Sequence, residues 1–185
     1  MFKRKEPTVR EQCSTSSNLK SSAYRVLKQK LSEGNSSLDS DLVDSMFPKK
    51  GTLTQYKHSQ HSFIYCRDDG LPVLFQRRDG PVMPCLRLVH MYPSEGWTSI
   101  VVDGGAIPFV LGGANIMYPG IKDPASSLSG MEEGAMVLVR AENKEHPLAV
   151  GVLMLPGDEA IKKNGGAVVK VEHFLGDALF REDRF

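Results

Sequence analysis

The 185-residue chain has few cysteines, a single tryptophan and no long apolar stretch, and these shortages exclude several classes of protein. Cys13, Cys66 and Cys85 are odd in number and far apart, so they form neither a disulfide framework nor a CxxC pair. No apolar run approaches the roughly 18–20 residues that cross a bilayer. The charged N-terminal segment lacks the apolar run of a secretory signal. We expect a cytoplasmic protein with reduced thiols and no membrane partner.

The motifs of common nucleotide-dependent enzymes are also missing. The chain has no GxGxxG after a strand and no GxxxxGK[ST] loop. No grouping of nucleophile, base and orienting residue stands out. The pair His58-x-x-His61 lies in a strand-like context, and its spacing matches no known metal site. We expect no catalytic residue, no metal and no cofactor.

The net charge of +1 conceals two halves of opposite sign. Residues 1–94 hold 15 Lys and Arg against 9 Asp and Glu, a net of +6, whereas residues 95–185 hold 8 against 13, a net of −5. The basic half suits diffuse contact with phosphates, which releases counterions. The acidic half must use shape, backbone donors and a local pocket if it binds nucleic acid. The Pro- and Gly-containing stretch 92–96 lies where the sign changes and marks a domain boundary.

The first half predicts a small α+β domain over residues 16–94, preceded by a flexible arm over 1–15. Apolar residues from Leu19 to Leu31 recur at helical spacing, and a second short helix covers about 38–46. Short β-type runs then occupy 52–57, 61–66 and 72–77, with the hairpin-type turn Asp68-Asp69-Gly70 between the last two. A short helix over about 84–91 ends this domain.

Residues 95–185 predict a small, partly closed β-barrel with short helices. Strands are expected over 98–102, 114–118, 135–140, 148–155 and 167–174, and short helices over 104–111 and 157–163. Many short strands separated by glycine-rich turns in under 90 residues are typical of such barrels. The whole chain is therefore placed in the α+β class.

Residues 103–121 carry the strongest functional signal. Three glycine-containing turns surround a short apolar helix, at Gly104-Gly105, Gly112-Gly113 and Pro119-Gly120. Glycine permits positive φ and close backbone approach, and successive N–H groups at such turns form anion-binding concavities. Asp103 is either the cap of this helix or a catalytic acid, and the cap is the simpler interpretation. Phe109 belongs either to the core or to a platform for stacking a base.

This segment resembles the signature of PUA domains, the RNA-binding barrels of pseudouridine synthases and archaeosine transglycosylases. The matching positions are Gly105-Ala106, Gly113-Ala114 and Pro119-Gly120-Ile121. Other phrases extend the resemblance over about 16–180, to the malignant-T-cell-amplified-sequence family of translation factors. They are Met46-Phe47-Pro48-Lys49-Lys50, Gln76-Arg77-Arg78-Asp79-Gly80-Pro81, Leu86-Arg87-Leu88-Val89-His90 and Gly112-Gly113-Ala114-Asn115-Ile116-Met117. The turn over 93–99 departs from the family pattern, which leaves the role of Trp97 open.

The resemblance implies a non-enzymatic factor that binds the small ribosomal subunit together with a density-regulated-type protein. It implies roles in reinitiation and in tRNA release during ribosome recycling, with the PUA barrel meeting the tRNA acceptor end. The RNA-binding residues that it implies are Gly104, Gly105, Ala106, Phe109, Gly112, Gly113, Ala114, Asn115, Pro119, Gly120 and Ile121.

The basic residues of the first half have two interpretations, solubility or contact with ribosomal RNA. We expect the phosphate contacts at Lys49, Lys50, Arg77 and Arg78. A second functional hypothesis also stands: the chain is the RNA-recruiting PUA subunit of an RNA-modification complex, with catalysis on a separate chain. The identity of the partner separates the two hypotheses.

Overall fold

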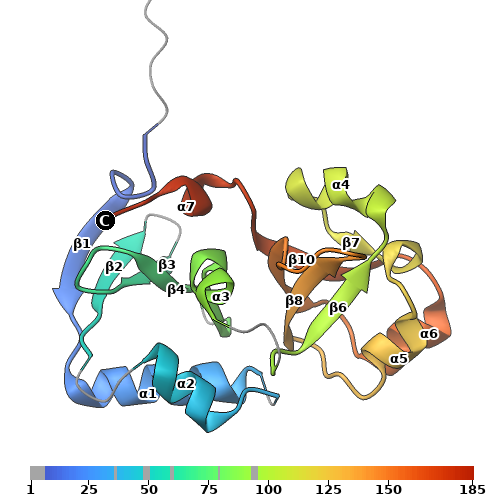
Figure 1. Ribbon diagram of the computed structural model, residues 1–185, viewed down its shortest axis with the longest axis horizontal. Coiled ribbons are helices and arrows are strands. Elements are labelled where there is room, and N and C mark those ends of the chain that lie inside the picture. The colour runs from blue at the N-terminus through green and yellow to red at the C-terminus, as the bar shows by residue number, and fades with distance from the viewer. Residues whose placement is uncertain (1–6, 36, 48–50, 59–60, 79, 93–95) are drawn as a thin grey trace, which may run out of the picture.

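The computed structural model describes residues 7–185, apart from positions 36, 48–50, 59–60, 79 and 93–95. It contains two units that lie side by side, each built on a five-stranded sheet (Figure 1). The predicted α+β class and the barrel-like second unit are confirmed. Among the described residues, no helix is long and apolar enough to cross a membrane.

The first sheet is an antiparallel meander in which each strand pairs with the next one along the chain. Its strands are β1 (Cys13–Asn18), β2 (Thr54–His58), β3 (Ser62–Cys66), β4 (Pro72–Arg77) and β5 (Val82–Pro84). The sequence predicted β2, β3 and β4 but neither edge strand. β1 carries no apolar alternation because it is a Ser- and Thr-rich edge strand, exposed at all but its first position. Its first three residues fall in the stretch expected to be an arm.

Three helices complete the first unit: α1 (Ser21–Glu33), α2 (Ser40–Met46) and α3 (Leu86–Met91). Tyr24, Leu27 and Leu31 lie three and four positions apart in α1, so they share one face, and all three are buried. They join Val43 and Met46 of α2 in a core that also contains the apolar residues of β3 and β4. The periodicity that predicted these helices is confirmed.

The second sheet has the strand order β6-β8-β9-β10-β7. Its strands are β6 (Ser99–Val102), β7 (Ile116–Met117), β8 (Met136–Ala141), β9 (Ala149–Leu153) and β10 (Ala167–Phe174). Between them lie η1 (Gly104–Ala106), α4 (Ile107–Leu111), η2 (Tyr118–Gly120), α5 (Pro124–Leu128) and α6 (Gly157–Lys163). β6 and β8 are parallel, and the other pairs are antiparallel.

Backbone contacts between β6 and the segment after β7 curl the second sheet into a partly closed barrel. Val102 forms an isolated antiparallel bridge with Ile121. The N–H of Asp103 donates to the carbonyl of Gly120 at 3.1 Å, and the N–H of Lys122 donates to that of Val101 at 2.8 Å. Because these contacts flank residues 103–120, they bring both ends of that segment together.

The two units share a packed seam. Asn35 of the α1–α2 connection accepts hydrogen bonds from the N–H and the hydroxyl of Thr98, both at 3.2 Å. The imidazole Nε2 of His90 in α3 lies 2.9 Å from the carbonyl oxygen of Pro147. Trp97, whose role the sequence left open, is buried with the first core.

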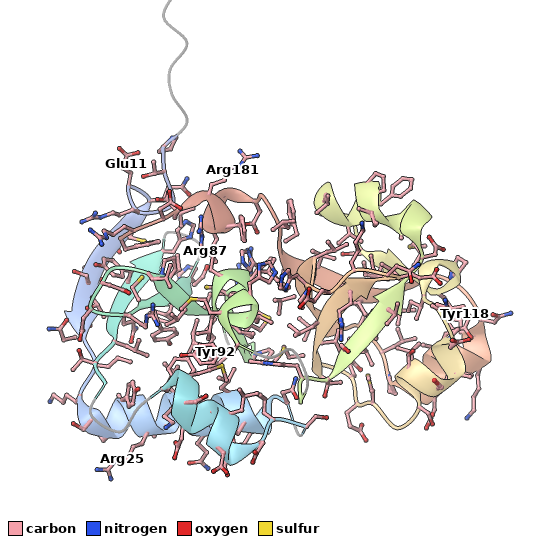
Figure 2. All side chains as sticks on the ribbon, in the orientation of Figure 1. Glu11, Arg25, Arg87, Tyr92, Tyr118 and Arg181 are labelled. Carbon is pink, nitrogen blue, oxygen red and sulfur yellow. The ribbon has the colours of Figure 1, made fainter. Side chains whose placement is uncertain are left out.

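Residues 175–185, here called the strap, leave the barrel and return to the first unit. The strap includes α7 (Ala178–Arg181). Arg87 of α3 donates from Nε to the carbonyl of Phe180 at 2.9 Å and from Nη2 to the carboxylate of Asp183 at 2.5 Å. Figure 2 shows Arg87 beneath this part of the chain. The strap therefore adds contacts between the barrel end and the first sheet.

Candidate functional site

The segment 103–121 folds as a short helical corner followed by a two-residue strand. The carboxylate Oδ1 of Asp103 accepts from the N–H of Ala106 at 2.9 Å, which caps η1. Pro108 lies in the first turn of α4, where its missing N–H is not needed. The cap expected from the sequence is confirmed.

Gly113 ends this helical corner in a conformation that requires glycine. Its φ is +78°, and a Cβ added there would lie 2.9 Å from Cε1 of Phe174 in β10. The missing side chain therefore allows the corner to pack directly on the barrel. This is a structural role, and it differs from the RNA contact that the resemblance implied for Gly113.

A cavity of about 350 Å³ opens between the helical corner and β7–η2. Six of the eleven predicted RNA-binding residues line it, namely Gly105, Ala106, Phe109, Asn115, Pro119 and Gly120. The other five, Gly104, Gly112, Gly113, Ala114 and Ile121, do not. Sequence reasoning missed the four lining residues Asp103, Val110, Ile116 and Met117 as site residues. The Gly-Ala pattern marked the turns, and nothing in it showed which apolar neighbours face the cavity. We call this cavity the signature pocket.

The most exposed large apolar side chain of the signature pocket is Phe109, at 69% of its surface. Met117 and Leu111 of the same segment are also exposed. The alternative that Phe109 belongs to the core is therefore wrong. An exposed apolar patch beside a cavity is typical of a binding surface, because desolvation of those side chains favours a ligand.

The electrostatics of the signature pocket favour a flat, uncharged group over a phosphate. α4 has only five residues, and the N–H of Ala106 is already occupied by the Asp103 carboxylate. That carboxylate also places a negative charge at the pocket wall. The occupied donor and the added negative charge both disfavour a phosphate at this turn. A nucleobase meets the same constraints, since it offers a π face to Phe109 and polar edges to Asn115.

The predicted phosphate contacts in the first unit differ in whether their charge is already paired. Arg77 donates from Nε to the Glu172 carboxylate at 2.8 Å and from Nη2 to the Glu172 carbonyl at 3.0 Å, which joins β4 to β10. Arg78 is exposed, in a left-handed conformation with φ of +48°. Lys49 and Lys50 lie outside the described residues. Of the two predicted contacts that the structure describes, Arg78 is therefore the one whose exposed charge has no ion pair to another described residue.

His58 and His173 take structural positions. Nε2 of His58 lies 3.1 Å from the amide oxygen of Gln12, and burial, with a smaller effect of the nearby Arg77 charge, lowers the pKa of His58. His173 is buried, and its Nδ1 lies 2.8 Å from the Asp177 carboxylate, which also accepts from the N–H groups of Phe174 and Phe180. Over the described part of the chain, no group of three or more potential metal ligands converges.

Comparisons with known proteins agree with both units. A Pre-PUA-like domain family matches residues 8–93, and the PUA domain family matches residues 98–175. Among solved structures, a hypothetical protein of Pyrococcus horikoshii superposes with a TM-score of 0.73 at 27% identity, covering 90% of this chain and 98% of that one.

Curated relatives extend over nearly the whole chain. Malignant T-cell-amplified sequence 1 homolog of Drosophila melanogaster is 39% identical over 181 residues, covering 98% of this chain and 97% of its own length. Translation machinery-associated protein 20 of Schizosaccharomyces pombe is 40% identical over 182 residues, covering 98% of each. Identity at this level over both units shows the family. The chain belongs to the malignant T-cell-amplified sequence family, whose fungal relatives bear the name translation machinery-associated protein 20.

Proposed function

We propose that this chain is a non-enzymatic, cytoplasmic RNA-binding factor of the translation machinery. In this proposal it binds the small ribosomal subunit as a heterodimer with a density-regulated-type protein. It acts there in reinitiation and in the release of tRNA during recycling. The names of its relatives support the link to translation, and the PUA match supports RNA binding.

The observation that carries this proposal is the signature pocket beside the exposed ring of Phe109. Stacking on an aromatic side chain is open only to a base that is free of its own stack, and it tolerates any base identity. The single-stranded end of a tRNA acceptor stem offers such bases. Asn115 and the backbone around Gly120 then supply polar partners for a base edge.

The first test measures binding of intact tRNA and of tRNA that lacks its single-stranded 3′ end. We expect Phe109→Ala to weaken binding of intact tRNA roughly five- to 150-fold, because base stacking contributes about 1–3 kcal/mol. Phe109→Tyr should retain binding, since it keeps the ring. Met91→Ala is the matched control, because Met91 is a similarly exposed apolar side chain on α3, outside the signature pocket. Equal affinity of wild type for the two tRNAs contradicts the role of the acceptor end.

The second test addresses the ribosome. Sedimentation of the tagged protein through sucrose gradients, at low and at moderate salt, should show it with small ribosomal subunits together with a density-regulated-type protein. Raising the salt should weaken this association, because phosphate contacts depend on counterion release. Migration only with light or nuclear complexes favours instead the RNA-recruiting subunit of a modification complex, and the ribosomal role is then withdrawn.

A further inference from the structure

A groove of about 600 Å³ crosses the seam between the two units, separate from the signature pocket. One wall comes from the end of the β3–β4 pair, with His61, Arg77 and Arg78. The opposite wall comes from the second unit, with Lys170 and Glu172 of β10. The volume falls within the range of about 300–1,000 Å³ that is typical of ligand clefts, and it exceeds what a single small ion fills.

The acid in this groove, Glu172, is already neutralised. Its side chain is 7% exposed, and its two oxygens accept from different cations, one from Arg77 at 2.8 Å and the other from Lys170 at 2.6 Å. One negative charge thus lies between two positive ones. The side chains of Arg77 and Lys170 nevertheless remain 48% and 59% exposed, so both cations still face solvent along the groove.

Arg78 adds a third cation and is fixed by its backbone. Its N–H donates to the carbonyl of His61 at 3.0 Å, at the end of the β3–β4 pair where both residues have positive φ. Its side chain has no ion pair among the described residues. Counting Lys, Arg, Asp and Glu, the described charges of the groove sum to a net of +2, with three cations against Glu172.

Apolar surface lies between the cations. Pro81, Met83 and Val152 line the groove together with Gly80. A row of cations beside apolar surface suits a sugar–phosphate backbone, in which charged phosphates alternate with the less polar faces of ribose. The arginine guanidinium groups add a planar fork of donors that fits phosphate oxygens.

From these observations we propose that the seam groove binds the phosphodiester backbone of RNA, with Arg78 from the first unit and Lys170 from the second as its phosphate contacts. This deepens the proposed function, because it rests on the protein binding RNA and adds a second contact outside the signature pocket. β10 joins the two places. It pairs with β7 of the signature segment at Ala167 and carries Lys170 three residues further on, roughly 10 Å along the strand. The two sites are therefore connected through one strand of the barrel.

The test measures affinity for a short fluorescent oligouridylate as a function of salt. Uridylate supplies phosphates with weakly stacking bases, so the groove dominates the slope of log affinity against log salt. Arg78→Asn removes a charge and keeps a residue that tolerates left-handed φ. Lys170→Gln removes the other charge and leaves Glu172 paired with Arg77. We expect each variant to lower the magnitude of the slope by about 0.7 and the double variant by about 1.4.

Lys162→Gln is the matched control. Lys162 is an exposed lysine on α6, which lies on the side of the second unit away from the first sheet (Figure 1). Urea midpoints close to that of wild type establish that the variants are folded. An unchanged slope in the double variant overturns the proposal, and so does an equal fall in the Lys162→Gln control. Competition by poly-glutamate as effective as that by oligouridylate overturns the assignment to an RNA backbone.

The two proposals fail in distinguishable ways. Phe109→Ala should weaken binding of tRNA while leaving the salt slope for oligouridylate unchanged, because stacking neutralises no phosphate. If the groove variants keep the wild-type slope while Phe109→Ala still weakens tRNA binding, the groove proposal falls and the proposed function stands. If wild type binds neither RNA, both fall.

Discussion

The ring of Phe185 packs against the ring of Tyr56, with centroids 5.0 Å apart and planes inclined by 55°. Tyr56 belongs to β2 in the first sheet, whereas Phe185 follows α7 beyond the barrel. The N–H of Phe185 donates to the carbonyl of Gly70 at 2.9 Å, and the N–H of Val9 donates to the carboxylate of Glu182 at 2.7 Å. The strap is therefore part of the first unit's packing, although it follows the second unit in sequence.

Replacing Phe185 by alanine should destabilise the protein. Phe185 is buried within the first core, so we expect Phe185→Ala to lower the free energy of unfolding by about 3 kcal/mol. Urea unfolding followed by fluorescence measures this change. Phe109→Ala is the control with the same chemical change at an exposed position, and it should alter stability little. Equal losses in the two variants contradict the strap's role.

Gly157 should tolerate no side chain. A Cβ there would lie 1.8 Å from the carbonyl oxygen of Leu128, where α6 packs on α5. Because the obstacle is backbone, the helices must move apart, and we expect Gly157→Ala to reduce stability by about 3 kcal/mol. Gly104 has no atom within 4 Å of such a Cβ, so Gly104→Ala is the matched control. Thermal unfolding of the two variants is compared. Equal melting temperatures for Gly157→Ala and Gly104→Ala would disprove this packing constraint.

Two substitutions of Asp103 should separate its effect on stability from its effect on RNA affinity. Asp103→Ala removes the cap and should lower stability by about 1 kcal/mol. Asp103→Asn keeps a cap oxygen and removes the negative charge from the signature pocket. Removing one charge about 8 Å from a phosphate in water amounts to roughly 0.5 kcal/mol, so tRNA should bind about twofold more tightly. Weaker tRNA binding by a stably folded Asp103→Asn protein indicates that the charge itself contacts RNA.

Acid should loosen the seam through His90. Burial is the largest cause that lowers the pKa of His90 below 6.5, and the charges of His146, His173 and Arg87 lower it further, while the bond to Pro147 opposes the shift. The unfolded chain therefore binds a proton more readily than the folded one. Stability from this site is present above pH 6.5 and is lost as the pH falls through the lower, folded-state value.

The measurement is the urea midpoint as a function of pH, for wild type and for His90→Gln. We expect wild type to lose more stability on acidification than the variant, because glutamine cannot take up a proton. His146→Gln should reduce the loss only in part, because the exposed His146 side chain, whose ring centroid lies 5.1 Å from that of His90, is a lesser cause of the lowered pKa of His90. Parallel pH profiles of wild type and His90→Gln contradict the assignment to His90.

The helices and central strands could be predicted because their burial repeats along the chain. Tyr24, Leu27 and Leu31 follow the helical period because α1 buries one face, and the short β-type run over 72–77 marks β4, whose first four residues are all buried. β1 and β5 escaped prediction for the same reason. β1 has no buried face and therefore no alternating apolar pattern. β5 is three residues long, which is too short to show such a pattern.

The sequence by itself determined the class of the fold, the family resemblance and the segment that holds the signature pocket, because glycine turns and apolar periods are local. Only the tertiary structure decided that Phe109 points to solvent, that Arg77 is tied to Glu172 across 95 positions, and that Lys170 faces Arg78 over a groove. Each of these three contacts or exposures depends on which distant elements pack together. The charge or apolarity of a single residue does not show which distant residue it will contact in the fold.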